Sequence, residues 1–168
     1  SHCEVAFFLD VGFQLLGVTV IAQYLSVLFV GDDALDTEEG YRGKLQFVFV
    51  MLGRSGQHGA EMGSGADGDV DAQPRSQPVL YNALFVGRAP SVGSTTPPAL
   101  LGLREGTGGD LGNIVLSNVY RVGLQQSDCG AEVRTNAEVS RGWKDVQMAA
   151  GGYLWVSPNL LMVGPGDY

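Results

Sequence analysis

The sequence predicts an all-β fold, a right-handed parallel β-helix, and two observations carry this prediction. An apolar phrase recurs at residues 3–8, 24–30 and 45–51, with starts about 21 positions apart, a spacing typical of stacked coils. The intervening segments 10–17 and 33–40 repeat an aspartate and a glycine at matching offsets. Because no single coil can bury its inward face alone, we expect neighbouring coils to form one continuous core.

After the third phrase, the chain is expected to alternate strands with loops. Residues 53–73 are rich in Gly, Ser and Asp, and residues 88–98 in Pro, Ser and Thr, so both predict long loops that leave the stack. The remaining apolar runs predict strands at residues 79–86, 99–106, 113–119, 153–156 and 159–163. Only residues 143–150 suggest a short helix. An antiparallel sandwich is the structural alternative, since it also consists of short periodic strands.

Length, composition and charge limit the possible classes of protein. A chain of 168 residues with 45% hydrophobic content is consistent with a single β-helix domain spanning residues 1–168. The sequence does not begin with Met and has no signal-peptide pattern, so we expect N-terminal coils or a targeting segment to be missing. The net charge of −8 argues against a nucleic-acid partner, which would require a basic surface.

Residues 11–30 carry no formal charge and are long enough to cross a bilayer as a helix. Gln14, Gln23 and the β-branched run at residues 18–21 favour two buried strands instead. The flanks also lack the Lys or Arg that would orient a span. No membrane span is favoured.

The densest acidic segment predicts a metal site. Calcium accepts six to eight oxygen ligands in flexible geometry, and the candidate ligands are Asp32, Asp33, Asp36 and Glu38. The alternative is a solvated turn, or an acidic ladder neutralised by Arg42 and Lys44 of adjacent coils. Arg104 and Glu105 are expected to form a structural ion pair between coils. Calcium therefore stays a possible cofactor.

Several ordered motifs resemble one family. Residues 31–47, 73–78 and 103–109, with 113–115, are similar to an uncharacterised microbial family of secreted or lipoprotein-type parallel β-helix proteins. The resemblance implies the fold and an extracytoplasmic location, in a secreted, periplasmic or organelle-lumen setting. It assigns no reaction.

The first coil departs from the pattern of that family. Gln14 stands where the family has a carboxylate, and Val18 where it has a glycine. These changes weaken an inherited metal or sugar site on this coil. The apolar side chains of Leu15, Leu16 and Val18 suit a surface that contacts a partner protein.

Two functional hypotheses follow. The first is a non-catalytic structural or interaction module, in its specific form an accessory subunit docked on a larger membrane-bound assembly such as a photosynthetic complex. The alternative is an extracytoplasmic protein that binds or cleaves polysaccharide with its acidic cluster, and cleavage would require either calcium with a basic residue or paired carboxylates across a groove. The sequence favours a binding module over an enzyme, with a protein partner expected and a glycan possible.

Overall fold

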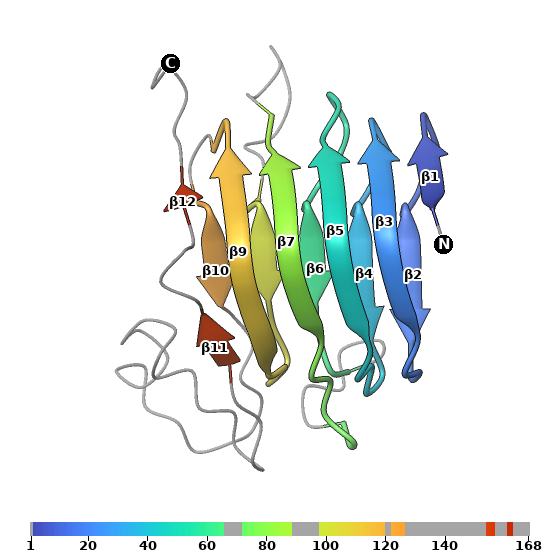
Figure 1. Ribbon diagram of the computed structural model, residues 1–168, viewed down its shortest axis with the longest axis vertical. Coiled ribbons are helices and arrows are strands. Elements are labelled where there is room, and N and C mark those ends of the chain that lie inside the picture. The colour runs from blue at the N-terminus through green and yellow to red at the C-terminus, as the bar shows by residue number, and fades with distance from the viewer. Residues whose placement is uncertain are drawn as a thin grey trace.

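The computed structural model describes residues 2–65, 72–88, 98–119, 122–126, 154–156 and 161–162. Within them, strands form two parallel sheets, of seven and five strands (Figure 1). The long sheet contains β1 (Cys3–Ala6), β3 (Ile21–Leu28), β5 (Lys44–Met51), β7 (Val79–Val86), β9 (Gly109–Ser117), β11 (Leu154–Val156) and β12 (Leu161–Met162). The short sheet contains β2 (Phe13–Leu16), β4 (Leu35–Glu38), β6 (Ala60–Met62), β8 (Leu101–Leu103) and β10 (Leu124–Gln126).

The strand order confirms the predicted parallel β-helix. From β1 to β10 the chain alternates between the long and the short sheet, and each strand pairs in parallel with the strand one coil away. Partners lie 22 positions apart between Gln14 and Asp36 and 23 between Gln23 and Gln46. The repeat is thus slightly longer than the sequence estimate.

The predicted strands of the long sheet are confirmed, whereas the short sheet contains strands that the sequence analysis did not predict. Residues 79–86 form β7 as predicted, and the second and third apolar phrases lie largely within β3 and β5. The connecting segments 10–17 and 33–40 contain β2 and β4, not turns alone. The helix expected at residues 143–150 lies outside the described residues. In the part of the chain that the structure describes, there is no helix long and apolar enough to span a membrane.

The core lies between the two sheets. In a strand, successive side chains point to opposite faces, so β8 buries Leu101 and Leu103 while Gly102 between them faces outward. The same alternation in β4 directs Leu35 inward and Asp36 outward. The apolar interior therefore determines which side chains the short sheet presents on its outer face.

A bend recurs in the long sheet at the same position of four coils. Tyr24, Phe47, Asn82 and Asn113 all have positive φ, between 52° and 60°. The extra left-handed residue shifts the alternation, so Leu45 and Val48, three positions apart, both face the core. Side chains at the bend stack between coils: the Tyr24 and Phe47 ring centroids are 5.0 Å apart, and the Asn113 amide donates to Asn82 at 3.1 Å. We call these four residues the bend row.

The first coil exposes apolar side chains at one end of the stack. Phe7 is 75% exposed and Leu9 is 93% exposed, both at the loop that follows β1. Leu16 and Val18 are also exposed, whereas Leu15 packs inward against the core. Of the three residues predicted to contact a partner, two are therefore on the surface.

Candidate functional site

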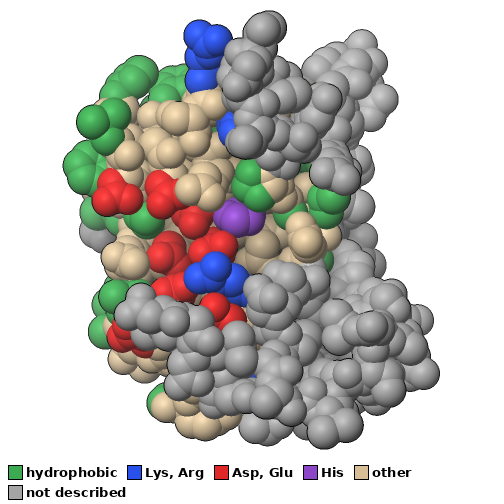
Figure 2. All heavy atoms as spheres, turned by 180° about the vertical axis from the view of Figure 1, so that it is seen from behind, with side chains coloured by type: hydrophobic (Ala, Val, Ile, Leu, Met, Phe, Trp, Pro, Cys, Tyr) green, Lys and Arg blue, Asp and Glu red, His purple; other side chains and the backbone are tan. Residues whose placement is uncertain are grey.

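The acidic residues gather on the outer face of the short sheet. Gln14, Asp36, Glu61 and Gly102 are register partners on β2, β4, β6 and β8, and they form one outward row. Seen from behind, this face carries acidic side chains around a histidine and a basic side chain (Figure 2). We define the carboxylate cluster as Asp33, Asp36, Glu38 and Glu61, together with His58 and Arg104.

Asp33 holds His58 in a defined orientation. Its Oδ1 accepts from the backbone N–H of His58 at 2.8 Å and lies 2.8 Å from the ring Nδ1. Because a carboxylate accepts, Nδ1 carries the proton in the neutral ring and Nε2 is left as an acceptor. Gly102 makes room for this ring, since a Cβ there would lie 3.1 Å from Nε2. Glu61 is the second acidic neighbour, 3.6 Å from Nδ1.

Arg104 is the cation of the cluster. Its Nη2 lies 2.9 Å from Glu38 and 3.3 Å from Glu61, which belong to two other coils. Its Nε also lies 3.4 Å from the carboxylate of Glu105, so the ion pair expected between Arg104 and Glu105 is present. That pair joins neighbouring residues of one coil. The contacts that Arg104 makes with other coils are those with Glu38 and Glu61.

Burial and the negative charge of neighbouring carboxylates favour the protonated form of two carboxyl groups in the cluster, those of Asp36 and Glu61. Asp36 is 6% exposed, and burial, followed by the charge of Glu38, raises its pKa to about 7. Burial and then the charge of Asp33 raise the pKa of Glu61. For His58, burial lowers the pKa, but the hydrogen bond and charge of Asp33 outweigh it, and the net shift is upward. Near neutral pH the cluster therefore retains a proton that an exposed carboxylate would release.

One oxygen of Asp36 has no hydrogen-bond partner among the described residues. Oδ2 accepts from the Gln14 amide at 3.1 Å, whereas Oδ1 is buried and unpartnered. Two groups of side chains could each hold a metal ion, because one ligand atom of each member lies within 4.8 Å of the others. The groups are Asp36 with Glu38 and Glu61, and Asp33 with His58 and Glu61. A buried unpaired carboxylate oxygen is unfavourable, so this geometry fits either a proton or a cation.

The other predicted residues lie at the edge of the cluster or outside it. Asp32 precedes Asp33 on the same loop, and burial, followed by the charge of Asp33, raises its pKa. Arg42 is exposed and donates to the Arg75 carbonyl at 3.2 Å, and Lys44 begins β5 on the other sheet. These two cations therefore do not neutralise the acidic row. Glu105 is buried and accepts from the backbone N–H of Gly65 at 3.1 Å.

The sequence reading missed Glu61, His58 and the role of Gln14. Glu61 lies in the three-residue strand β6, too short for its alternation to stand out. Two histidines and two cysteines are too few to indicate a zinc site, so the composition does not single out His58. Its acidic neighbours appear only when the coils are stacked.

The fold and the site together define a class: a parallel β-helix with carboxylates on the outer face of one sheet. A family model described as a pectate-lyase-like β-helix domain matches residues 1–149, and the chain belongs to this family. This agrees with the resemblance noted from the sequence motifs. Comparisons with curated proteins and with solved structures gave no match.

Proposed function

We propose that this protein acts on polysaccharide outside the cytoplasm and that the carboxylate cluster hydrolyses a glycosidic bond. The observation that carries the proposal is the grouping of three shielded carboxyls: Asp36, Glu38 and Glu61 lie together, and burial raises the pKa of Asp36 to about 7. Glycosidases require one carboxyl to protonate the leaving oxygen and a second, ionised one. Membership of the pectate-lyase-like family supports the polysaccharide class.

The roles within the cluster follow from exposure and pairing. Glu61 is the proposed acid, since burial raises its pKa and its side chain is 16% exposed, enough to reach a bound chain. Glu38, which lies 2.9 Å from Arg104 Nη2 against 3.3 Å for Glu61, is proposed as the second carboxylate. Asp36 is the register partner of Glu61 on the neighbouring strand, and its raised pKa keeps a proton in the cluster. Because the carboxyl oxygens approach within 4.8 Å, nearer the ~5–5.5 Å of retaining enzymes than the ~6.5–9.5 Å of inverting ones, retention is expected.

The test is hydrolysis of a panel of polysaccharides, with the anomer of the first product read by NMR. Glu61→Gln should lower the rate by roughly a hundredfold or more. Glu4→Gln is the control, since Glu4 is an exposed glutamate on β1. No hydrolysis of any substrate, or equal rates in both variants, would contradict the proposal. Unsaturated products would indicate a lyase instead.

A cation in place of the proton is the alternative chemistry for the same cluster. Asp36, Glu38 and Glu61 offer the oxygen ligands that Ca²⁺ prefers, and Glu61 joins the ligand set predicted from the sequence. Calcium would then favour ionised Asp36 and remove the acid. Raising Ca²⁺ should increase Tm in the wild-type chain and less in Asp36→Asn. An unchanged Tm in both proteins would argue for the proton.

A second candidate function rests on the first coil. Its exposed Phe7, Leu9, Leu16 and Val18 suit either a protein partner, as an interaction module or accessory subunit would require, or a preceding coil of the same chain. Native purification with identification of co-migrating proteins tests it. A partner lost in Leu16→Lys and kept in Lys44→Gln would support the candidate, whereas a monodisperse monomer under native conditions would count against it.

A further inference from the structure

Three different side chains offer ligand atoms at one point on the outer face of the short sheet. Asp33 precedes β4, and His58 and Glu61 lie one coil further along, just before and within β6. His58 Nδ1 lies 2.8 Å from Asp33 Oδ1 and 3.6 Å from Glu61 Oε1. The three side chains are 9%, 15% and 16% exposed. An ion can therefore reach them from solvent, although most of their surface is shielded.

These separations are those of neighbouring ligands around a transition metal. Zinc binds imidazole nitrogen and carboxylate oxygen at ~2.0–2.2 Å. An ion at these distances would see Asp33 and His58 at an angle of roughly 85°, and His58 and Glu61 at roughly 120°. The ligand atoms of Asp33 and Glu61 also lie within 4.8 Å of each other, so a small rotation of either carboxylate lets one ion contact all three. In contrast, 3.6 Å is too long for a hydrogen bond between His58 and Glu61.

Neighbouring groups already orient the three ligands. Asp33 Oδ1 accepts from the backbone N–H of His58 at 2.8 Å. Glu61 Oε2 lies 3.3 Å from Arg104 Nη2, while Oε1 lies near the imidazole. A Cβ on Gly102 would lie 3.0 Å from Cδ2 of His58, so the ring packs closely against this glycine. Contacts of this kind hold metal ligands in place before the ion arrives.

A buried oxygen of Asp36 gives independent evidence for a positive charge beside these ligands. Asp36 is 6% exposed, and its Oδ1 has no hydrogen-bond partner among the described residues. Its other oxygen accepts from Gln14 on β2, and Glu61, its register partner on β6, lies on the opposite side of β4. An Asp36 oxygen and a Glu61 oxygen lie within 4.8 Å of each other. A cation held by Glu61 would therefore stabilise this oxygen, which is otherwise unfavourably buried.

From this geometry we infer that Asp33, His58 and Glu61 bind a divalent transition-metal ion such as Zn²⁺, and that the bound ion inhibits hydrolysis at the carboxylate cluster. The imidazole ligand favours a transition metal, whereas Ca²⁺ prefers oxygen ligands alone. When the ion binds, the Nδ1 proton leaves and Nε2 takes up a proton, so the ring stays neutral. Glu61 is then an ionised ligand and has no proton for a leaving oxygen. Only the inhibition rests on the proposed function.

The first experiment measures ion binding by calorimetry in the metal-free full chain, with Zn²⁺ and Ca²⁺ as the probes. We expect one Zn²⁺ per chain, bound at least ~10-fold more tightly than Ca²⁺. His58→Gln removes the nitrogen ligand and should weaken Zn²⁺ binding by ~10-fold or more. Nitrogen NMR of the wild-type chain reads the same ring without a substitution, and Zn²⁺ should shift the Nδ1 resonance of His58.

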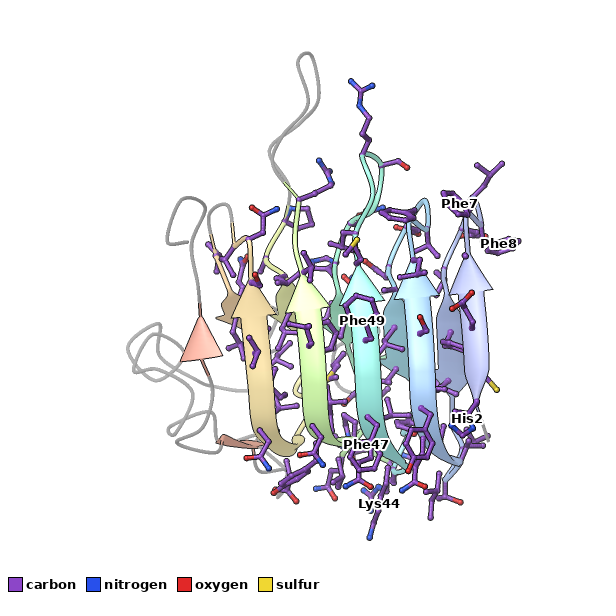
Figure 3. All side chains as sticks on the ribbon, turned by 45° about the horizontal axis from the view of Figure 1, so that its top comes forward. His2, Phe7, Phe8, Lys44, Phe47 and Phe49 are labelled. Carbon is purple, nitrogen blue, oxygen red and sulfur yellow. The ribbon has the colours of Figure 1, made fainter. Side chains whose placement is uncertain are left out.

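His2→Gln is the matched control, because His2 is the second of the two histidines in the chain. His2 lies at the start of β1 (Figure 3), where its ring stacks on Tyr24 with centroids 4.4 Å apart. This variant should bind Zn²⁺ as tightly as wild type. Equal effects of His58→Gln and His2→Gln, tighter binding of Ca²⁺ than of Zn²⁺, or no binding of Zn²⁺ would overturn the proposed site.

The second experiment measures hydrolysis with and without Zn²⁺, each protein being compared with its own metal-free rate. Saturating Zn²⁺ should lower the wild-type rate by roughly 100-fold, the scale of losing an acid catalyst. At the same Zn²⁺ concentration, His58→Gln should be inhibited much less. Hydrolysis that bound Zn²⁺ leaves unchanged would overturn the inhibition. Zn²⁺ binding at His58 in a chain that hydrolyses nothing would remove only the proposed function, and hydrolysis by a chain that binds no Zn²⁺ would remove only this inference.

Discussion

Asp36 should make the folded protein less stable as pH rises through the neutral range. Its folded-state pKa is about 7 against an ordinary value of 3.8, because burial and then Glu38 disfavour its charge. Between these values the folded chain binds more protons than the unfolded chain, so the free energy of unfolding falls as pH rises. Three pKa units at ~1.36 kcal/mol each correspond to about 4 kcal/mol, fully lost above pH 7.

The perturbation is Asp36→Asn, which keeps the shape and removes the charge. The Asn oxygen can still accept from Gln14, and its NH₂ takes the place of the unpartnered Oδ1. Relative to wild type, the variant should be up to about 4 kcal/mol more stable at pH 8, with the gap closing towards pH 4. The assay is urea unfolding at steps of pH between these limits.

Asp110→Asn provides the control, since Asp110 lies on the long sheet outside the cluster. Its profile should follow that of wild type. Parallel profiles for wild type and Asp36→Asn would refute the reasoning, because they would mean that Asp36 ionises freely in the folded state. The retained proton, and with it the proposed acid chemistry, would then lose its basis.

Three further predictions concern the fold around the sites. Arg104→Met should lower the free energy of unfolding by about 1–2 kcal/mol at pH 7. This figure is reduced for solvent screening, because the Arg104 side chain is 33% exposed. Urea unfolding at pH 5 should give a smaller loss. Gly43→Ala would bring a Cβ against the carbonyl of Val20 and the hydroxyl of Tyr41, so thermal and urea unfolding should report a loss of at least ~2 kcal/mol. Phe85→Ala, in the fully buried core, should cost ~3–5 kcal/mol by the same measurement.

The long sheet was predictable because its strands are long and apolar. The apolar phrases predicted β3, β5 and β7 with small errors at their ends. The short sheet was harder, because a strand such as Ala60–Met62 has only one outward residue between two inward ones. Three residues carry too little alternation to distinguish a strand from a loop.

The candidate site was predictable only within one coil. Asp33, Asp36 and Glu38 are close in sequence, and their clustering was visible there. His58 lies 25 positions from Asp33, and Arg104 lies 66 positions from Glu38. The loops between coils set these offsets, and composition alone does not fix how many residues a loop removes from the stack. Arg42 shows the same uncertainty, since one alternative placed it beside the acids, whereas it donates to the Arg75 carbonyl.

The bend row marks a position that is the same in each of its coils, although the number of residues per coil varies. From one coil to the next, the bend residues are separated by different numbers of residues. Gln23 and Gln46, which directly precede Tyr24 and Phe47, are 23 positions apart, whereas Asn82 and Asn113 are 31 positions apart. The backbone nevertheless turns at the same height in every one of these coils. The additional residues lie in the loops at the other turns of the coil. New loops can therefore be grafted at those turns without changing the register of the strands. A single residue inserted beside the bend would instead rotate every following side chain of its strand to the opposite face.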